Sequence, residues 1–161
     1  AEYNRVRPYV YSHSDPLTNY ASVNQSLGHQ WGANFSEFVA IARYHNGRIF
    51  ADAKLTAGTR GFDFDTTENT LNYGGNIYKD YDENRAFDTN VKIGQGNKTT
   101  IFIADLQAGY VINPSTNLKL FGSLIFRNFN PTVETATVFK ENTTWFSVGI
   151  RSDIFNWYFD Y

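Results

Sequence analysis

The sequence predicts an all-β fold, an antiparallel transmembrane β-barrel of which about six strands are visible. Apolar residues recur with period two rather than 3.6, and aromatic residues make up 17% of the chain. Short turns alternate with long, polar connections, as in outer-membrane barrels. No window holds the roughly 18 consecutive apolar residues of a membrane-spanning helix, so a helical membrane protein is excluded.

The strands follow from the alternation, taken in order along the chain. The first, 2–11, sets Arg5 and Arg7 against Val6, and Pro8 predicts a break because it cannot donate to a ladder. The second and third, 34–44 and 49–58, are joined through Asn-Gly, which is a strong hairpin signal.

The remaining predicted strands are 100–112, 118–129 and 144–153. A short turn with Pro114 joins the first two of them. The other connections are long: 12–33, 59–99 and 130–143. We expect a single barrel segment over 1–161, with these three loops extracellular. Because a structureless loop as long as 59–99 is unusual, we also expect a further hairpin within it, around 86–93.

One face of each predicted strand is apolar and suits lipid, with Tyr44 and Tyr110 as interface aromatics. The opposite faces collect charge, which would be very costly in a packed core and therefore predicts a wide lumen. The predicted lumen charges are Arg5, Arg7, Glu37, Arg43, Asp52, Lys54, Asp105, Lys119, Arg127, Arg151 and Asp153.

Six strands are too few for a closed barrel in lipid, and an open sheet edge is not tolerated there. Either the 59–99 loop holds more strands, or the chain is the C-terminal portion of a larger barrel. The alternating Phe155, Trp157, Phe159 and Tyr161 are typical of a last barrel strand, and the start without Met, in mid-strand, favours the second alternative.

The residues give no indication of an enzyme. The absence of Cys excludes thiolate metal sites and cysteine nucleophiles, and the net charge of −2 argues against nucleic acid. Asp80, Asp82 and Asn84 begin like a calcium loop, but Arg85 stands where that loop requires Gly. Asp63 and Asp65 are a weak glycosidase signal. We therefore expect no catalytic residue, no metal and no cofactor.

The long loops carry a set of aromatic residues among Asn, Asp and Gln. Aromatic faces beside planar amides and carboxylates suit carbohydrate, because sugar C–H faces stack on rings while hydroxyls bond to polar side chains. Packing of the loops against each other explains the same residues equally well. The glycan-binding candidates are Tyr20, Trp31, Tyr73, Tyr78 and Tyr81.

Several stretches resemble the Wzi-type outer-membrane capsule-assembly family, above all its RemB-like, gliding-motility-associated members. They are 2–9, 11–13, 27–29, 32–35, 72–78, 92–96 and 149–156. The resemblance covers most of this chain but only the C-terminal part of the family's barrel. It implies the outer membrane of a Gram-negative bacterium and a non-catalytic role in attaching or organising surface polysaccharide, or in surface adhesion machinery. The family supplies no catalytic residues.

Three functions are therefore expected in competition. The first is a polysaccharide-binding barrel, the second a pore or transporter with a charged lumen, and the third a structural subunit of a larger outer-membrane complex. The expected partners are outer-membrane lipid, surface polysaccharide and other subunits of such a complex.

Overall fold

The computed structural model describes residues 1–152, apart from the side chain of Pro16. The fold is all-β. Among the described residues, no helix is both long and apolar enough to cross a membrane. Asp153 and the alternating aromatic residues Phe155, Trp157, Phe159 and Tyr161 lie outside the described part.

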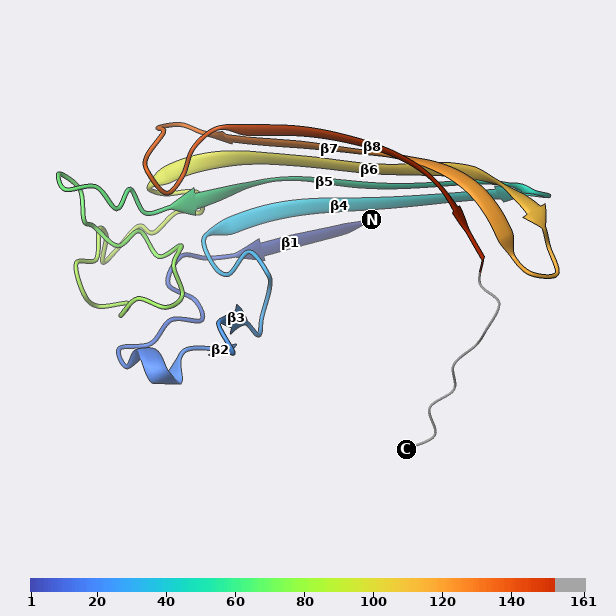
Figure 1. Ribbon diagram of the computed structural model, residues 1–161. Helices are drawn as coiled ribbons and strands as arrows, with labels where there is room; N and C mark the ends of the chain where they lie inside the picture. Colours follow the sequence, from blue (N-terminus) through green and yellow to red (C-terminus); the bar gives the residue numbers. More distant parts are fainter. Residues whose placement is uncertain (153–161) are drawn as a thin grey trace.

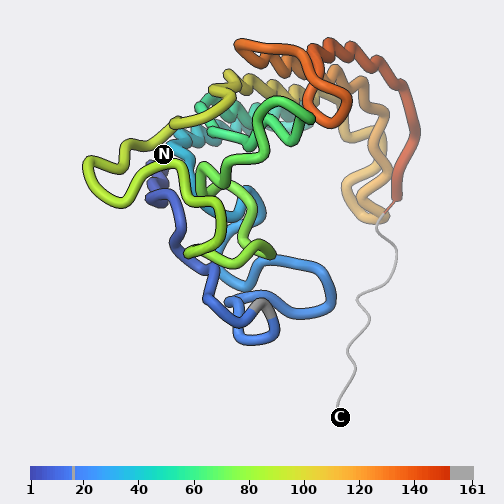
Figure 2. The backbone as a smooth tube through the Cα atoms, turned by 90° about the vertical axis from the view of Figure 1, so that its left-hand side faces the viewer, coloured from blue at the N-terminus to red at the C-terminus, as the bar shows by residue number. Residues whose placement is uncertain are grey.

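Six strands form one antiparallel sheet in the order β1-β4-β5-β6-β7-β8 (Figure 1). The sheet curls into an arc but does not close, so that β1 and β8 are both edges (Figure 2). The strands are β1 (Glu2–Val6), β4 (Phe35–Asn46), β5 (Ile49–Phe62), β6 (Asn97–Asn113), β7 (Leu118–Pro131) and β8 (Glu141–Arg151). A barrel therefore remains a proposal.

Short turns lie at one end of the sheet and long loops at the other. Gly47 adopts a φ of +58° at the first position of the two-residue turn between β4 and β5, a conformation that hairpin turns of this length require. The opposite end carries the loops 7–34, 63–96 and 132–140 (Figure 1). The first contains the 3₁₀ turn η1 (Pro16–Thr18) and the small hairpin of β2 (Ala21–Ser22) with β3 (Gln25–Ser26).

Most strand ends differ from the expected ones by one to four residues, as where β5 runs on to Phe62, and two expected elements differ more. The first strand ends at Val6 rather than residue 11, because Tyr9 adopts a positive φ of 64° and donates its backbone N–H to Gly74 in the loops. The expected hairpin around 86–93 is wrong. Within 63–96 the structure forms only an isolated bridge between Asn72 and Arg85.

The first two loops lie below the concave side of the sheet at its loop end, and the third turns at the ends of β7 and β8 (Figures 1 and 2). Trp31 of the first loop packs on this concave side with Phe35 and Ile101, and their cluster also contacts Val6, Ile103 and Phe129. Near the loops the concave face is therefore covered, with this apolar cluster packed beside buried polar residues such as Glu37 and Thr99. Toward the turns it is open and charged: the side chains of Arg43 and Asp52, paired across β4 and β5, are 80% and 49% exposed.

The convex face is apolar and uncovered. Its exposed large apolar side chains from β4 to β8 are Phe38, Tyr44, Ile49, Leu55, Phe102, Leu106, Tyr110, Ile112, Leu120, Leu124, Phe126, Phe146, Val148 and Ile150. Among the described residues of β4 to β8, charge reaches this face only at Lys98, beside the loops.

Candidate functional site

A buried asparagine joins the start of β4 to the longest loop. Asn34 is fully buried with a φ of +61°. Its Nδ2 donates to the carbonyls of Gly61, Tyr73 and Gln95 at 3.1, 3.4 and 2.9 Å. Its Oδ1 accepts the N–H of Gly94 at 2.7 Å. One side chain thus fixes the 63–96 loop against the end of β5.

Two further buried asparagines hold the loops in the same way. Asn72 donates to the carbonyl of Asp80 and accepts from the N–H of Gly74, both at 2.8 Å. Asn97, at the start of β6, donates to the carbonyl of Val133 at 2.7 Å and accepts its N–H at 3.0 Å. Because buried polar groups must be paired, these contacts give irregular loops a defined shape.

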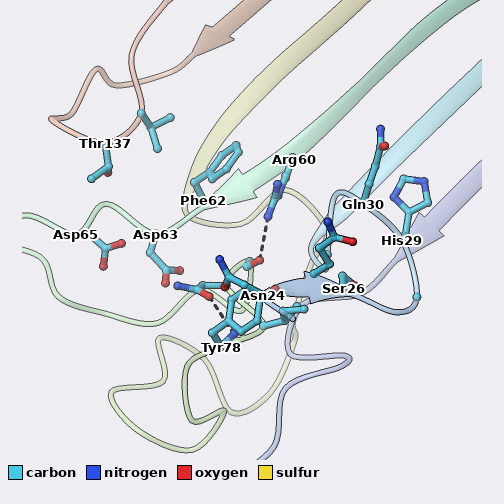
Figure 3. Close-up of a pocket in the computed structure, with 17 residues that line it drawn as sticks. Asn24, Ser26, His29, Gln30, Arg60, Phe62, Asp63, Asp65, Tyr78 and Thr137 are labelled. Atoms are coloured by element: carbon cyan, nitrogen blue, oxygen red, sulfur yellow. Dashed lines mark hydrogen bonds between the residues drawn. The ribbon is translucent and has the colours of Figure 1, made fainter. Parts of the chain in front are cut away.

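The loops enclose a polar cavity of about 720 Å³, here called the loop cavity. Arg60 and Phe62 at the end of β5 form one wall, and Asn24 and Gln30 of the first loop another (Figure 3). Asp63, Asp65 and Tyr78 come from the second loop, and Thr137 from the third. All three long loops therefore contribute to a single site, whose volume lies within the range of small-ligand pockets.

The carboxylates of the loop cavity share one ammonium group. Lys79 Nζ lies 2.8 Å from Asp63 Oδ2 and 2.6 Å from Asp65 Oδ1. The other oxygen of Asp63 accepts the N–H of Tyr73 at 2.8 Å. Burial alone would lower the pKa of Lys79, but the hydrogen bonds and charges of the two aspartates outweigh it and raise the pKa above 10.5. Lys79 is thus charged at neutral pH and bonded to both carboxylates.

Arg60 is the cation of the cavity with the fewest partners. Its Nη2 donates to the carbonyl of Gly75 at 3.3 Å, and its guanidinium lies 4.5 Å from the ring centre of Phe62. Its buried Nε has no hydrogen-bond partner. Among the described residues no carboxylate lies within ion-pair distance of it.

A smaller, more apolar cavity of about 380 Å³ adjoins the first. Trp31, Ile101 and Phe129 line it, together with Arg60 and Phe62, which line both spaces. Arg60 therefore stands between a polar and an apolar compartment.

The predicted glycan-binding aromatics do not form one surface. Tyr78 lines the loop cavity and is 42% exposed. Trp31 is buried against Phe35, with ring centres 5.6 Å apart. Tyr20 is exposed but stacks on Tyr11, at 5.5 Å and away from the cavity lining.

Tyr73 and Tyr81 also pack within the loops. Tyr73 lies between the rings of Phe64 and Phe87, at 5.5 and 6.3 Å, and Tyr81 meets His13 edge-on at 6.3 Å. The packing alternative therefore describes these two residues and Trp31, whereas Tyr78 alone of the five lines the loop cavity.

Most predicted lumen charges share the concave face. Register pairing places them there across the sheet, and the residues are Glu37, Arg43, Asp52, Lys54, Asp105, Lys119, Arg127 and Arg151. The prediction that Arg5 shares this face is wrong, because Arg5 pairs with Ser36 and so lies on the convex face of the edge strand. Arg7 follows the end of β1, and its side chain is exposed.

The sequence reasoning missed Arg60, because it ended the strand at residue 58. Continuing the alternation of Asp52, Lys54 and Thr56 by two more steps reaches Arg60 on the same face. The polar residues of the first loop that line the cavity, such as Asn24 and Gln30, carry no local signal of this kind.

Comparisons with known protein families, with curated proteins and with solved structures found no match to this chain.

Proposed function

We propose that the chain forms part of the wall of an outer-membrane β-barrel, whose loop cavity binds surface polysaccharide without catalysis. The observation that carries the proposal is the uncovered apolar convex face, opposite a concave face that bears charge. Strands β4 to β8 have 12, 14, 17, 14 and 11 residues. Each is long enough for a membrane-spanning strand, which needs about 9–11 residues.

The extent of the apolar convex face and the position of its tyrosines favour contact with lipid over contact with water. Contiguous apolar patches on soluble monomers rarely exceed a few hundred Å². Here the face runs across five strands, with Tyr44 and Tyr110 near the turns, where a barrel places interface aromatics. The free edges of β1 and β8 are intolerable in hydrocarbon, so the proposal includes closure by further strands.

The loop cavity supports the polysaccharide part of the proposal. Asn24, Gln30 and Asn76 present amides that suit sugar hydroxyls, and Tyr78 offers a partly exposed ring for the apolar face of a sugar. The resemblance to the Wzi-type family implies the same class of ligand. No group in the cavity is arranged as a nucleophile and base pair among the described hydrogen bonds, and the proposed role is binding.

The membrane part is tested by single cysteines, because the chain contains none of its own. Leu106→Cys and Leu124→Cys lie on the convex face, and Gln107→Cys and Ser123→Cys are their neighbours on the concave face. We expect fluorophores at the first two to be quenched by spin-labelled lipid, and a water-soluble maleimide to react at the second two. Equal quenching at all four positions in the full-length, bilayer-inserted protein would contradict the proposal.

The ligand part is tested on an array of bacterial surface polysaccharides. Tyr78→Ala is expected to weaken binding by up to about tenfold, the upper end of what a contact with an aromatic ring contributes. Tyr20→Ala is the matched control, since Tyr20 is exposed on the loops but does not line the cavity. Equal binding by both variants and the unmodified protein would exclude the loop cavity as the site.

A further inference from the structure

The guanidinium of Arg60 is held in place while most of its hydrogen-bonding capacity is unused. Arginine has five N–H donors in a planar fork. The structure gives Arg60 one hydrogen bond, to the carbonyl of Gly75, and leaves Nε without a partner. Contact with the ring of Phe62 fixes the group further. Arg60 is partly buried, and a buried donor such as its Nε is costly to leave unpaired unless an acceptor reaches it.

The nearby carboxylates do not serve as that acceptor. The two oxygens of Asp63 accept hydrogen bonds from Lys79 and from the N–H of Tyr73, and Asp65 also accepts one from Lys79. Neither lies within ion-pair distance of Arg60. Both carboxylates are thus bonded to Lys79, and Arg60, which feels the charge of Asp63 without pairing with it, lines the cavity beside it (Figure 3).

The surroundings of Arg60 select the kind of anion. A small inorganic ion would not use the amides of Asn24 and Gln30 or the ring of Tyr78, which line the same space. A sugar that carries a carboxylate uses all of them: its hydroxyls bond to amides, its ring stacks, and its carboxylate pairs with the guanidinium fork.

We infer that the loop cavity binds an acidic saccharide, whose carboxylate is received by Arg60. The inference rests on the proposed function and deepens it, because it names the charge of the glycan and the residue that recognises it. Arg60 then acts as the specificity-determining residue, and Tyr78 and the amides supply contacts that a neutral sugar also makes.

The test compares three polymers on the full-length protein: polygalacturonate, its methyl ester and dextran. The ester keeps the sugar and removes the charge. We expect polygalacturonate to bind at least tenfold more tightly than the ester. Equal affinity for acid and ester overturns the inference while the proposed function stands. If none of the three polymers binds, the polysaccharide proposal fails together with the inference.

Variants then identify the residue. Arg60→Gln is expected to abolish the preference for the acid, and Arg60→Lys to retain part of it. Lys140→Gln is the matched control, since it removes one positive charge from an exposed position outside the cavity lining. In a background in which Trp145 and Trp157 are replaced by Phe, the fluorescence of Trp31, which lies in the adjoining wall, reports whether each variant keeps the loops in place. A preference that persists in folded Arg60→Gln assigns recognition elsewhere and overturns the role of Arg60.

Discussion

His29 Nε2 lies 2.8 Å from Glu37 Oε2, and this contact fastens the first loop to the sheet. The other ring nitrogen of His29 accepts the N–H of Trp31 at 3.1 Å. Because an accepting Nδ1 carries no proton, the geometry assigns the proton to Nε2, which donates to the carboxylate. Glu37 is 4% exposed, and Asn4 donates to the same oxygen at 3.3 Å.

His29→Ala is therefore expected to loosen the first loop. It leaves Glu37 buried with a single weak donor, at a cost of about 3 kcal/mol by analogy with broken buried pairs. Glu37→Gln removes the charge and keeps an acceptor for Nε2–H, so its effect should be smaller, about 1 kcal/mol.

The double variant His29→Ala/Glu37→Gln completes the cycle. We expect it to be less destabilised than the sum of the single variants, measured by unfolding followed through Trp31 fluorescence in a background with Trp145→Phe and Trp157→Phe. Strict additivity would show that the two side chains do not interact in the folded protein.

Two substitutions of Asn34 distinguish the loss of its side-chain hydrogen bonds from the strain of its backbone conformation. Asn34→Gly tolerates the positive φ but loses four hydrogen bonds, whereas Asn34→Ala loses these bonds and also adopts an unfavourable backbone. We expect losses of about 3 kcal/mol for Gly and about 1 kcal/mol more for Ala. Hydrogen exchange of Gly94 reports the broken contact directly. Unchanged protection of Gly94 in both variants would contradict the anchoring role of Asn34.

Alkaline pH should loosen the loops. The pKa of Lys79 is raised above 10.5, as the aspartates outweigh burial, and burial raises the pKa of Tyr9 above 10.0. A raised pKa means that the folded state holds its proton more tightly than the unfolded state. Both groups therefore stabilise the folded loops fully below about pH 10, and this stabilisation is lost as pH rises through the folded pKa values.

Protection of the 63–96 backbone amides, measured between about pH 8 and pH 12, checks this expectation. Tyr9→Phe removes one of the two contributions, together with the hydrogen bond from the Tyr9 hydroxyl to the carbonyl of Asn72, and should flatten the alkaline decline. If protection declines with pH as steeply in Tyr9→Phe and in Lys79→Gln as in the unmodified protein, other groups cause the decline.

Adjacent positions on β6 should respond oppositely to charge. Leu106 faces the convex side and Gln107 the concave side, where Asp52 is its register partner. Leu106→Arg is expected to destabilise the bilayer-inserted protein by about 2–4 kcal/mol, as arginine does near the midplane of a barrel. Gln107→Arg should change stability by less than about 1 kcal/mol. Equal effects of the two substitutions would argue against lipid on the convex face.

The sequence by itself determined the strands and most of their faces. Alternation along 49–58 and 100–112 is a local property, because successive side chains of a strand point to opposite sides. It therefore predicted the sheet, the hairpin at Gly47 and the common face of Asp52, Lys54 and Asp105. It failed for Arg5, where both faces of a short edge strand mix polar and apolar residues and only pairing with Ser36 decides.

Only the tertiary structure decided what the loops do. The loop cavity joins residues as distant as Asn24, Arg60 and Thr137, and their meeting depends on long-range hydrogen bonds from buried asparagines. Such bonds have no period along the chain. For the same reason, Trp31 and Tyr78 look alike in the sequence, yet one packs the core and the other faces the cavity. Burial in irregular segments is set by the partners that folding brings together, rather than by neighbours in the sequence.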